Sequence, residues 1–246
     1  MKSSNENYLY SQWARIGVGF DSNPTQASAS VESLFTRTCL AASDFPRLFW
    51  AAASWLAVHH QLVNCRLLAK RLETLDSQFS AVAGAILSVA IELNPTASTL
   101  DQVSLHCSPL RGKRVLFAQY ANNLVLADYA KKESLKLFDE WGFWHNQISD
   151  KRDAIRPISW IIKACPDLRI RSVLGASLDA EIMHHVLISP LSATALMNKL
   201  PYTYASIHEA ASRLCGRGLL RKRAQGRALV LHVPENIKRW LDKIPA

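Results

Sequence analysis

The chain lacks the cysteine patterns that hold small secreted domains together or bind structural zinc. Its five cysteines are odd in number and scattered, and no two of them form a CxxC pair. Disulfide frameworks use even numbers of cysteines and zinc sites use closely spaced pairs, so the sequence argues against both. We expect reduced, mostly buried thiols, as in a cytoplasmic protein. The cysteines are Cys39, Cys65, Cys107, Cys165 and Cys215.

Long hydrophobic runs are also missing. The most apolar stretches, 48–63 and 81–93, are interrupted by His59 and His60 or end after roughly a dozen residues, whereas a membrane-spanning helix needs ~20 apolar residues. The first residues lack the apolar core of a signal peptide. We therefore expect a cytoplasmic protein with no membrane partner.

Motifs of common enzymes are absent as well. The sequence contains no glycine-rich phosphate loop, no nucleophile elbow, no HExxH helix and no paired-carboxylate site. The adjacent pairs His59-His60 and His184-His185 do not form chelating motifs, because neighbours on a helix point in different directions. We expect no enzymatic activity, no cofactor and no metal site.

Acidic residues are scarce only in the last part of the chain. Residues 1–150 hold 13 Lys or Arg and 13 Asp or Glu, whereas residues 151–246 hold 16 and 7. The whole excess of nine positive charges therefore lies in the C-terminal part. Such an excess favours polyanionic partners, although a solvated basic surface gives the same count. The pattern of residues has to distinguish these two interpretations.

The spacing of apolar residues predicts a mainly α protein with several parts. Residues 1–30 are rich in Ser, Asn and Gly and predict a flexible N-terminal arm. Residues 31–150 predict a helical domain for dimerisation or sensing, and Pro157 and Pro166 indicate a connector over 151–176.

Within the helical domain, we expect long helices separated by a loop. The apolar spacing predicts one helix over 43–75 and a second over 76–93. Residues 94–113 have little periodicity and predict a long loop, and helical character resumes over 114–144.

Residues 177–246 show an informative order of elements, in which three helices are followed by a β-hairpin. The second helix begins at the cap Ser192, and the third begins at the cap Thr203 and ends at Gly216 or Gly218. A polar turn over 221–227, around Gly226, joins the strands of the hairpin. The buried positions predicted for the third helix are Ile207, Ala210, Ala211 and Leu214.

This order resembles the winged helix-turn-helix family of bacterial transcription regulators. The resemblance rests on a short helix, a tight turn and the pattern TYASIxEAAxRLxxxGLLxK over 203–222, and it covers about sixty residues. Leu200-Pro201 stands at the turn, where the family commonly has a glycine. The resemblance implies a small β-hairpin wing and a third helix that enters the major groove of DNA, which is about 12 Å wide.

The exposed face of the third helix and the wing supply the predicted DNA contacts. Polar side chains on the helix can reach base edges or phosphates, and the cations of the hairpin suit the phosphate backbone or a narrow minor groove. Glu209 is compatible with DNA if it accepts from a cytosine amino group or pairs with Arg213. The predicted DNA-binding residues are Ser192, Thr203, Tyr204, Ser206, His208, Ser212, Arg213, Arg221, Lys222, Arg223 and Arg227.

A further role is open for Cys215, which lies next to the basic wing in the sequence. Nearby cations lower the pKa of a thiol, so Cys215 is the best candidate for a thiol sensor. A structural role is the alternative for this residue.

The expected function is sequence-specific binding of double-stranded DNA by a transcriptional regulator, a repressor that acts as a homodimer on a palindromic site. One alternative is an interaction or adaptor protein whose winged-helix domain binds protein or non-specific nucleic acid. Another is a regulator gated by a small-molecule or protein effector at the N-terminal domain, which requires an apolar pocket with a few polar groups.

Overall fold

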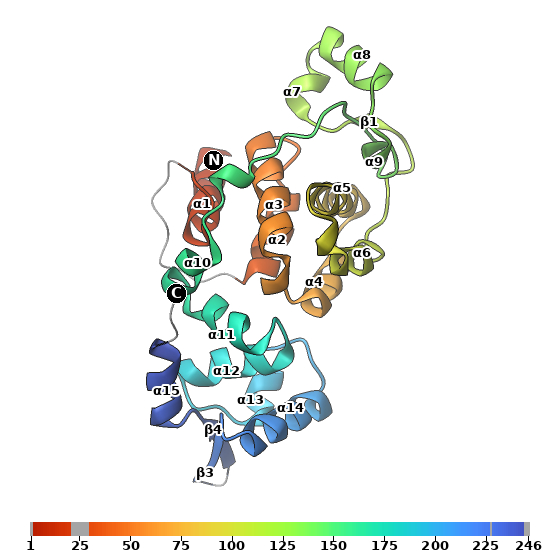
Figure 1. Cartoon of the computed structure of the whole chain (residues 1–246). Helices are drawn as coiled ribbons and strands as arrows, with labels where there is room; N and C mark the ends of the chain where they lie inside the picture. Colours follow the sequence, from red (N-terminus) through yellow and green to blue (C-terminus); the bar gives the residue numbers. More distant parts are fainter. Residues whose placement is uncertain (1, 21–29, 227, 244–246) are drawn as a thin grey trace. The chain divides into compact units, whose positions relative to one another are not determined.

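The computed structural model describes residues 2–20, 30–226 and 228–243 (Figure 1). Over these residues the protein is mainly helical, with one parallel and one antiparallel pair of strands. The chain forms two compact units, Met1–Pro157 and Ile158–Ala246. No helix in the described ranges has the length and apolar character needed to cross a membrane.

Helices form the core of the first unit. The apolar helices α3 and α5 are almost entirely buried, and Trp55 of α3 is among the largest fully buried side chains. The elements of the first unit are α1 (Lys2–Arg15), α2 (Val31–Cys39), α3 (Pro46–His59), η1 (His60–Leu62), α4 (Cys65–Leu72), α5 (Ser77–Leu93), η2 (Pro95–Ala97), α6 (Thr99–Ser104), β1 (Arg114–Val115), α7 (Ala118–Ala121), α8 (Leu124–Lys132), α9 (Lys136–Asp139), β2 (Phe143–Trp144) and η3 (Arg152–Ala154).

The N-terminal segment contains helix α1 and differs from the flexible arm predicted over 1–30. Leu9 and Trp13 are buried, and Trp13 Nε1 donates a hydrogen bond to Thr38 Oγ1 at 2.8 Å. These two apolar residues lie one helical turn apart, a spacing that the surrounding Ser and Asn residues concealed. Residues 21–29 of the predicted arm lie outside the described residues.

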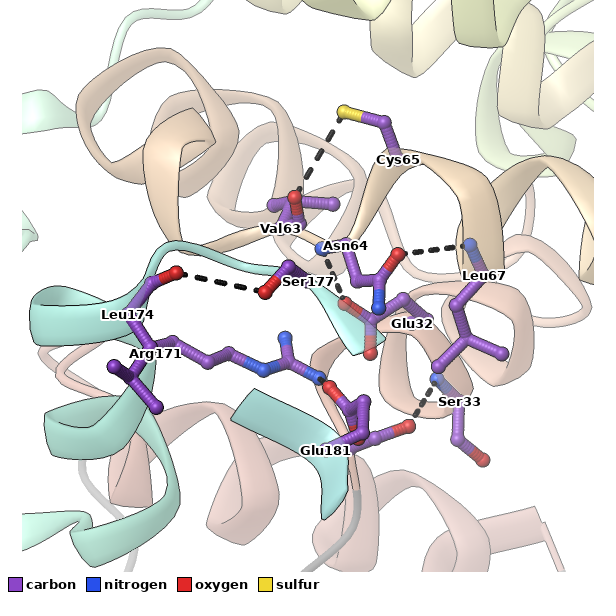
Figure 2. A network of polar contacts seen from close by, with 11 residues as sticks. Glu32, Ser33, Val63, Asn64, Cys65, Leu67, Arg171, Leu174, Ser177 and Glu181 are labelled. Atoms are coloured by element: carbon purple, nitrogen blue, oxygen red, sulfur yellow. Dashed lines mark hydrogen bonds and ion pairs between the residues drawn. The ribbon is translucent and has the colours of Figure 1, made fainter. Parts of the chain in front are cut away.

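The single helix predicted over 43–75 is divided, because α3 ends at His59, the short turn η1 follows and α4 begins after Asn64. Asn64 Oδ1 accepts a hydrogen bond from Leu67 N at 3.1 Å, which caps α4 (Figure 2). The backbone N–H of Asn64 donates to Glu32 Oε1 at 2.8 Å, and Glu32 is fully buried. A side chain that caps a helix start competes with continuation of the preceding helix, so the apolar spacing alone misplaced this boundary.

The region predicted as a loop over 94–113 and a helix over 114–144 consists of short elements. The loop region contains η2 and α6, and β1 pairs in parallel with β2, with Arg114 opposite Phe143. Strands of two residues leave no measurable period in a sequence, so the pattern did not indicate this sheet.

The second unit has its own core, to which α11–α14, β4 and α15 all contribute. The segment predicted as a connector over 151–176 contains α10 and α11, and Ile170 of α11 belongs to this core. Arg171 of α11 donates a hydrogen bond to Glu181 of α12 at 2.6 Å, and both residues are buried (Figure 2). The elements are α10 (Ile158–Ala164), α11 (Pro166–Leu174), α12 (Leu178–Ile188), α13 (Ala193–Met197), α14 (Tyr204–Gly216), β3 (Arg221–Gln225), β4 (Ala228–His232) and α15 (Glu235–Asp242).

Candidate nucleic-acid interface

Helix α14 begins and ends where the sequence predicts. Thr203 Oγ1 caps it by accepting a hydrogen bond from Ser206 N at 3.3 Å. The helix ends at Gly216, and Gly218 follows with φ of +73°, a left-handed conformation that favours glycine. The predicted set of buried positions is confirmed, and the remaining residues of α14 are exposed except Ser206 and Cys215, which are half-buried. The buried residues are Ile207, Ala210, Ala211 and Leu214.

The predicted contact residues of α14 lie on two flanks of the helix. Tyr204 and His208 are one turn apart, and their rings stack with 6.0 Å between centroids and 26° between planes. Ser212 is exposed one further turn along the same flank. Ser206 and Arg213 lie on the other flank, because successive residues of an α-helix are rotated by about 100°.

The guanidinium of Arg213 is held by two carboxylates. Its Nη2 donates to Asp179 Oδ1 of α12 at 2.9 Å, and its Nη1 lies 3.3 Å from Glu209 Oε1. The hydrogen bond to Asp179 raises the pKa of Arg213. The sequence analysis gave two arrangements in which Glu209 is compatible with DNA, and pairing with Arg213 is one of them. On this flank two acidic side chains accompany one basic side chain, which weakens attraction for phosphate.

The second unit is hollowed on the flank of Tyr204 and His208. The hollow, here called the α14 groove, has a volume of about 280 Å³ and is lined by residues of α13, α14 and the hairpin. Lys222 supplies a cation to the groove, and Leu229, which is 65% exposed, supplies an apolar surface. The polar lining consists of Ser192, Thr194, Tyr204, His208 and Lys222.

The basic residues of β3 are distributed over both faces of the hairpin. Lys222 pairs with Leu231 of β4, and both residues line the α14 groove. Side chains alternate between the faces of a strand, so Arg221 and Arg223 lie on the opposite face from Lys222. All three basic side chains are exposed. Arg227, the fourth predicted cation, lies outside the described residues.

The polar turn predicted over 221–227 is shorter in the structure, because Arg221–Gln225 is strand β3. Gly226 follows it with φ of +60°. This strand consists of three consecutive basic residues followed by Ala224 and Gln225, so it has no apolar face by which the sequence could reveal it.

Strand β4 also pairs with Leu191, the residue that precedes the cap of α13. Leu191 N donates to Leu231 O at 3.2 Å, and Leu231 N donates to Leu191 O at 2.8 Å. The next residue, Ser192, caps α13 by accepting from Ala195 N at 3.1 Å. This bridge fixes the start of α13 against the hairpin, and sequence reasoning missed it. In the sequence, the indication of this bridge was Leu191 itself, one apolar residue in extended conformation between Pro190 and the cap Ser192.

Cys215 does not have the properties expected of a thiol sensor. Burial raises the pKa of the Cys215 thiol, and the smaller opposing effect of Lys222 does not reverse the shift. A raised pKa keeps the thiol protonated and therefore unreactive at neutral pH. The expectation that the basic wing activates this cysteine is corrected accordingly.

Comparisons of the chain with protein-family models, with curated proteins and with solved structures found no match. Among the described residues, no three His, Cys, Asp or Glu side chains are grouped so that they could hold a metal ion.

Proposed function

We propose that the second unit is a winged helix-turn-helix domain that binds double-stranded DNA and that the protein is a transcriptional regulator. The observation that carries this proposal is the α14 groove, where the exposed flank of α14 and the basic hairpin meet at Tyr204, His208 and Lys222. In this interpretation α13 and α14 are the helix-turn-helix, and β3 and β4 are the wing.

The charge of the second unit supports a polyanionic partner. Residues 158–246 contain 13 Lys or Arg and 6 Asp or Glu, an excess of seven positive charges. Lysine and arginine residues that neutralise phosphates release the counterions condensed on DNA, which supplies a large part of binding free energy. The exposed Arg221, Lys222 and Arg223 place three of these charges next to α14.

The proposed mode of binding follows from the two flanks of α14. A helix of 13 residues is about 20 Å long and fits into the major groove of B-DNA. Tyr204, His208 and Ser212 face the bases, while Lys222 contacts a backbone phosphate beside them. One such helix covers only a short DNA sequence. In this proposal two copies of the chain therefore bind the two half-sites of a palindrome as a homodimer. The proposed regulatory role of this dimer is repression.

The test is a fluorescence-anisotropy titration of the full chain against the DNA upstream of its own gene and against a shuffled duplex, at two salt concentrations. A regulator prefers its own site by a factor on the order of 10³ or more. Equal, salt-sensitive binding to both duplexes points instead to non-specific nucleic-acid binding. Absence of binding at low salt overturns the proposal and favours a protein-interaction role.

A further inference from the structure

A second pocket lies in the first unit, and the DNA-binding proposal makes no use of it. It has a volume of about 290 Å³ and is lined by the end of α2, the start of α5 and the segment from β1 to α7. Its floor contains the buried side chains of Cys39, Val82 and Leu116. Ala118 N donates to Ser43 O at 3.0 Å, which holds the β1–α7 segment beside the end of α2. A volume near the lower limit of ligand pockets fits only a small molecule.

Two opposite charges line this pocket. Asp44 and Arg114 both contribute to its rim, where both residues are exposed, and within the described ranges neither forms an ion pair. The Arg114 guanidinium lies 5.7 Å from the centre of the Phe143 ring, a cation–π contact that does not use its hydrogen-bond donors. The neighbouring residue Lys113, in contrast, forms an ion pair, with its Nζ 3.1 Å from Asp139 Oδ2.

We propose that this pocket binds a small zwitterion, an α-amino acid with an apolar side chain. Its carboxylate binds the Arg114 guanidinium and its ammonium group binds Asp44, so that each charge of the pocket gains a charge-assisted hydrogen bond. Its side chain packs on Val82 and Leu116, and Ser43 and Gln78 supply further hydrogen-bonding groups. A ligand with only one of the two charges leaves the other residue of the pair to water, because Asp44 and Arg114 are both exposed, and it therefore gains only one charge-assisted hydrogen bond.

The first test is calorimetric titration of the full chain with L-valine, L-leucine and L-phenylalanine. The matched probes are L-leucinamide, which lacks the carboxylate, 4-methylpentanoate, which lacks the ammonium group, and glycine, which lacks the side chain. We expect at least one of the three amino acids to bind and, where leucine binds, each matched probe to bind about tenfold more weakly or worse. Equal affinity for leucine and leucinamide overturns the charge assignment, and no binding by any amino acid overturns the proposal.

The second test uses variants of the two charged residues. Asp44→Asn and Arg114→Gln should each weaken binding of the amino acid at least tenfold. The control variants Asp101→Asn and Arg111→Gln make the same charge changes at exposed positions outside the pocket, and they should bind normally. Equal losses in variants and controls overturn the proposed site, once circular dichroism has shown that all four variants are folded. Both titrations are done without DNA, so their outcome does not depend on the proposed regulatory function.

Discussion

Arg213 of α14 donates a hydrogen bond to Asp179 of α12 at 2.9 Å, whereas Lys222 of β3 faces the α14 groove on the other flank of the same helix. Both residues are among the DNA-binding residues predicted from the sequence. They differ in their surroundings, because a phosphate near Arg213 is repelled by Asp179 and Glu209. The proposed DNA complex therefore depends more on Lys222.

The two cations should respond differently to substitution. Lys222→Ala is expected to weaken binding to every duplex and to lower the slope of log affinity against log salt by about 1, since one phosphate contact is lost. Arg213→Ala should change the slope less. Asp179→Asn should strengthen binding, because it removes one of the two negative charges beside Arg213. Anisotropy titrations over a series of salt concentrations measure all three, and equal slopes for Lys222→Ala and Arg213→Ala would contradict the assignment of flanks.

The stacked pair of Tyr204 and His208 should govern sequence preference. His208→Ala is expected to reduce the preference for the cognate duplex about tenfold, in line with ~1–3 kcal/mol for a base contact, while the salt slope stays nearly constant. Ser206→Ala is the control, because Ser206 lies on the other flank and its hydroxyl is 2.9 Å from Thr203 Oγ1. Loss of preference in Ser206→Ala alone would place the bases on the opposite flank. Competition binding with single-base substitutions in the duplex measures the effect.

How much the sequence could predict depends on whether the determinants are local. The bounds of α14 follow from the cap Thr203 and the glycines that end the helix, all within one stretch of chain. The position of Lys222 in the α14 groove depends on pairing between Leu191 and Leu231, forty residues apart. Neither residue differs in type from an ordinary core leucine, so the sequence could name Lys222 as a contact residue but could not place it in the groove beside Tyr204 and His208.

The first unit shows the same limit more strongly. Asn64 does not interrupt the spacing of apolar residues over 43–75, so the pattern did not show that a helix starts there. The backbone N–H of Asn64 is bonded to Glu32 of α2, a contact between residues far apart in the sequence. The pocket with Asp44 and Arg114 joins residues seventy positions apart. A regulator gated by a ligand needs such a pocket, but no local pattern in the sequence indicated where it lies.

Packing at Gly84 gives a stability prediction for the first unit. A Cβ at this position would overlap the ring of Trp141, and Trp141 Nε1 is held by a hydrogen bond to Ser88 Oγ at 2.8 Å. Gly84→Ala should therefore destabilise the protein by about 1–3 kcal/mol despite the higher helix propensity of alanine. Gly112→Ala is the control, since a Cβ there meets nothing within 4 Å. Chemical denaturation followed by circular dichroism measures both, and an unchanged Gly84→Ala would show that Trp141 can move.

Buried His145 should make the first unit sensitive to acid. Burial in a cluster with Phe117 and Tyr120 lowers the pKa of His145 to about 4. In the unfolded chain the pKa of this histidine is near 6.5, so as pH falls the unfolded chain takes up the proton before the folded chain does. The free energy of unfolding therefore has its full value above pH 6.5 and declines as pH falls towards 4. We expect a loss of about 2 kcal/mol at pH 5.

His145→Phe keeps an aromatic ring in the cluster and removes the proton site. It should reduce the difference in unfolding free energy between pH 7 and pH 5. Part of the difference should remain, because burial also lowers the pKa of His59. Denaturation of the variant and the natural chain at both pH values measures the change. An equal pH dependence in the two proteins would show that His145 is not the group responsible.

The buried ion pair between Arg171 and Glu181 tests whether α11 is an integral part of the second unit. Glu181→Gln removes the carboxylate that lies 2.6 Å from the Arg171 guanidinium in a buried environment, and we expect a loss of about 3–5 kcal/mol. The double variant Arg171→Met with Glu181→Leu should recover most of this stability, because apolar side chains of similar volume avoid the cost of burying charge. Denaturation of the three proteins measures the differences. A neutral Glu181→Gln would mean that α11 is not held by this pair, and a double variant as unstable as the single one would mean that the pair is needed to position α11 against α12.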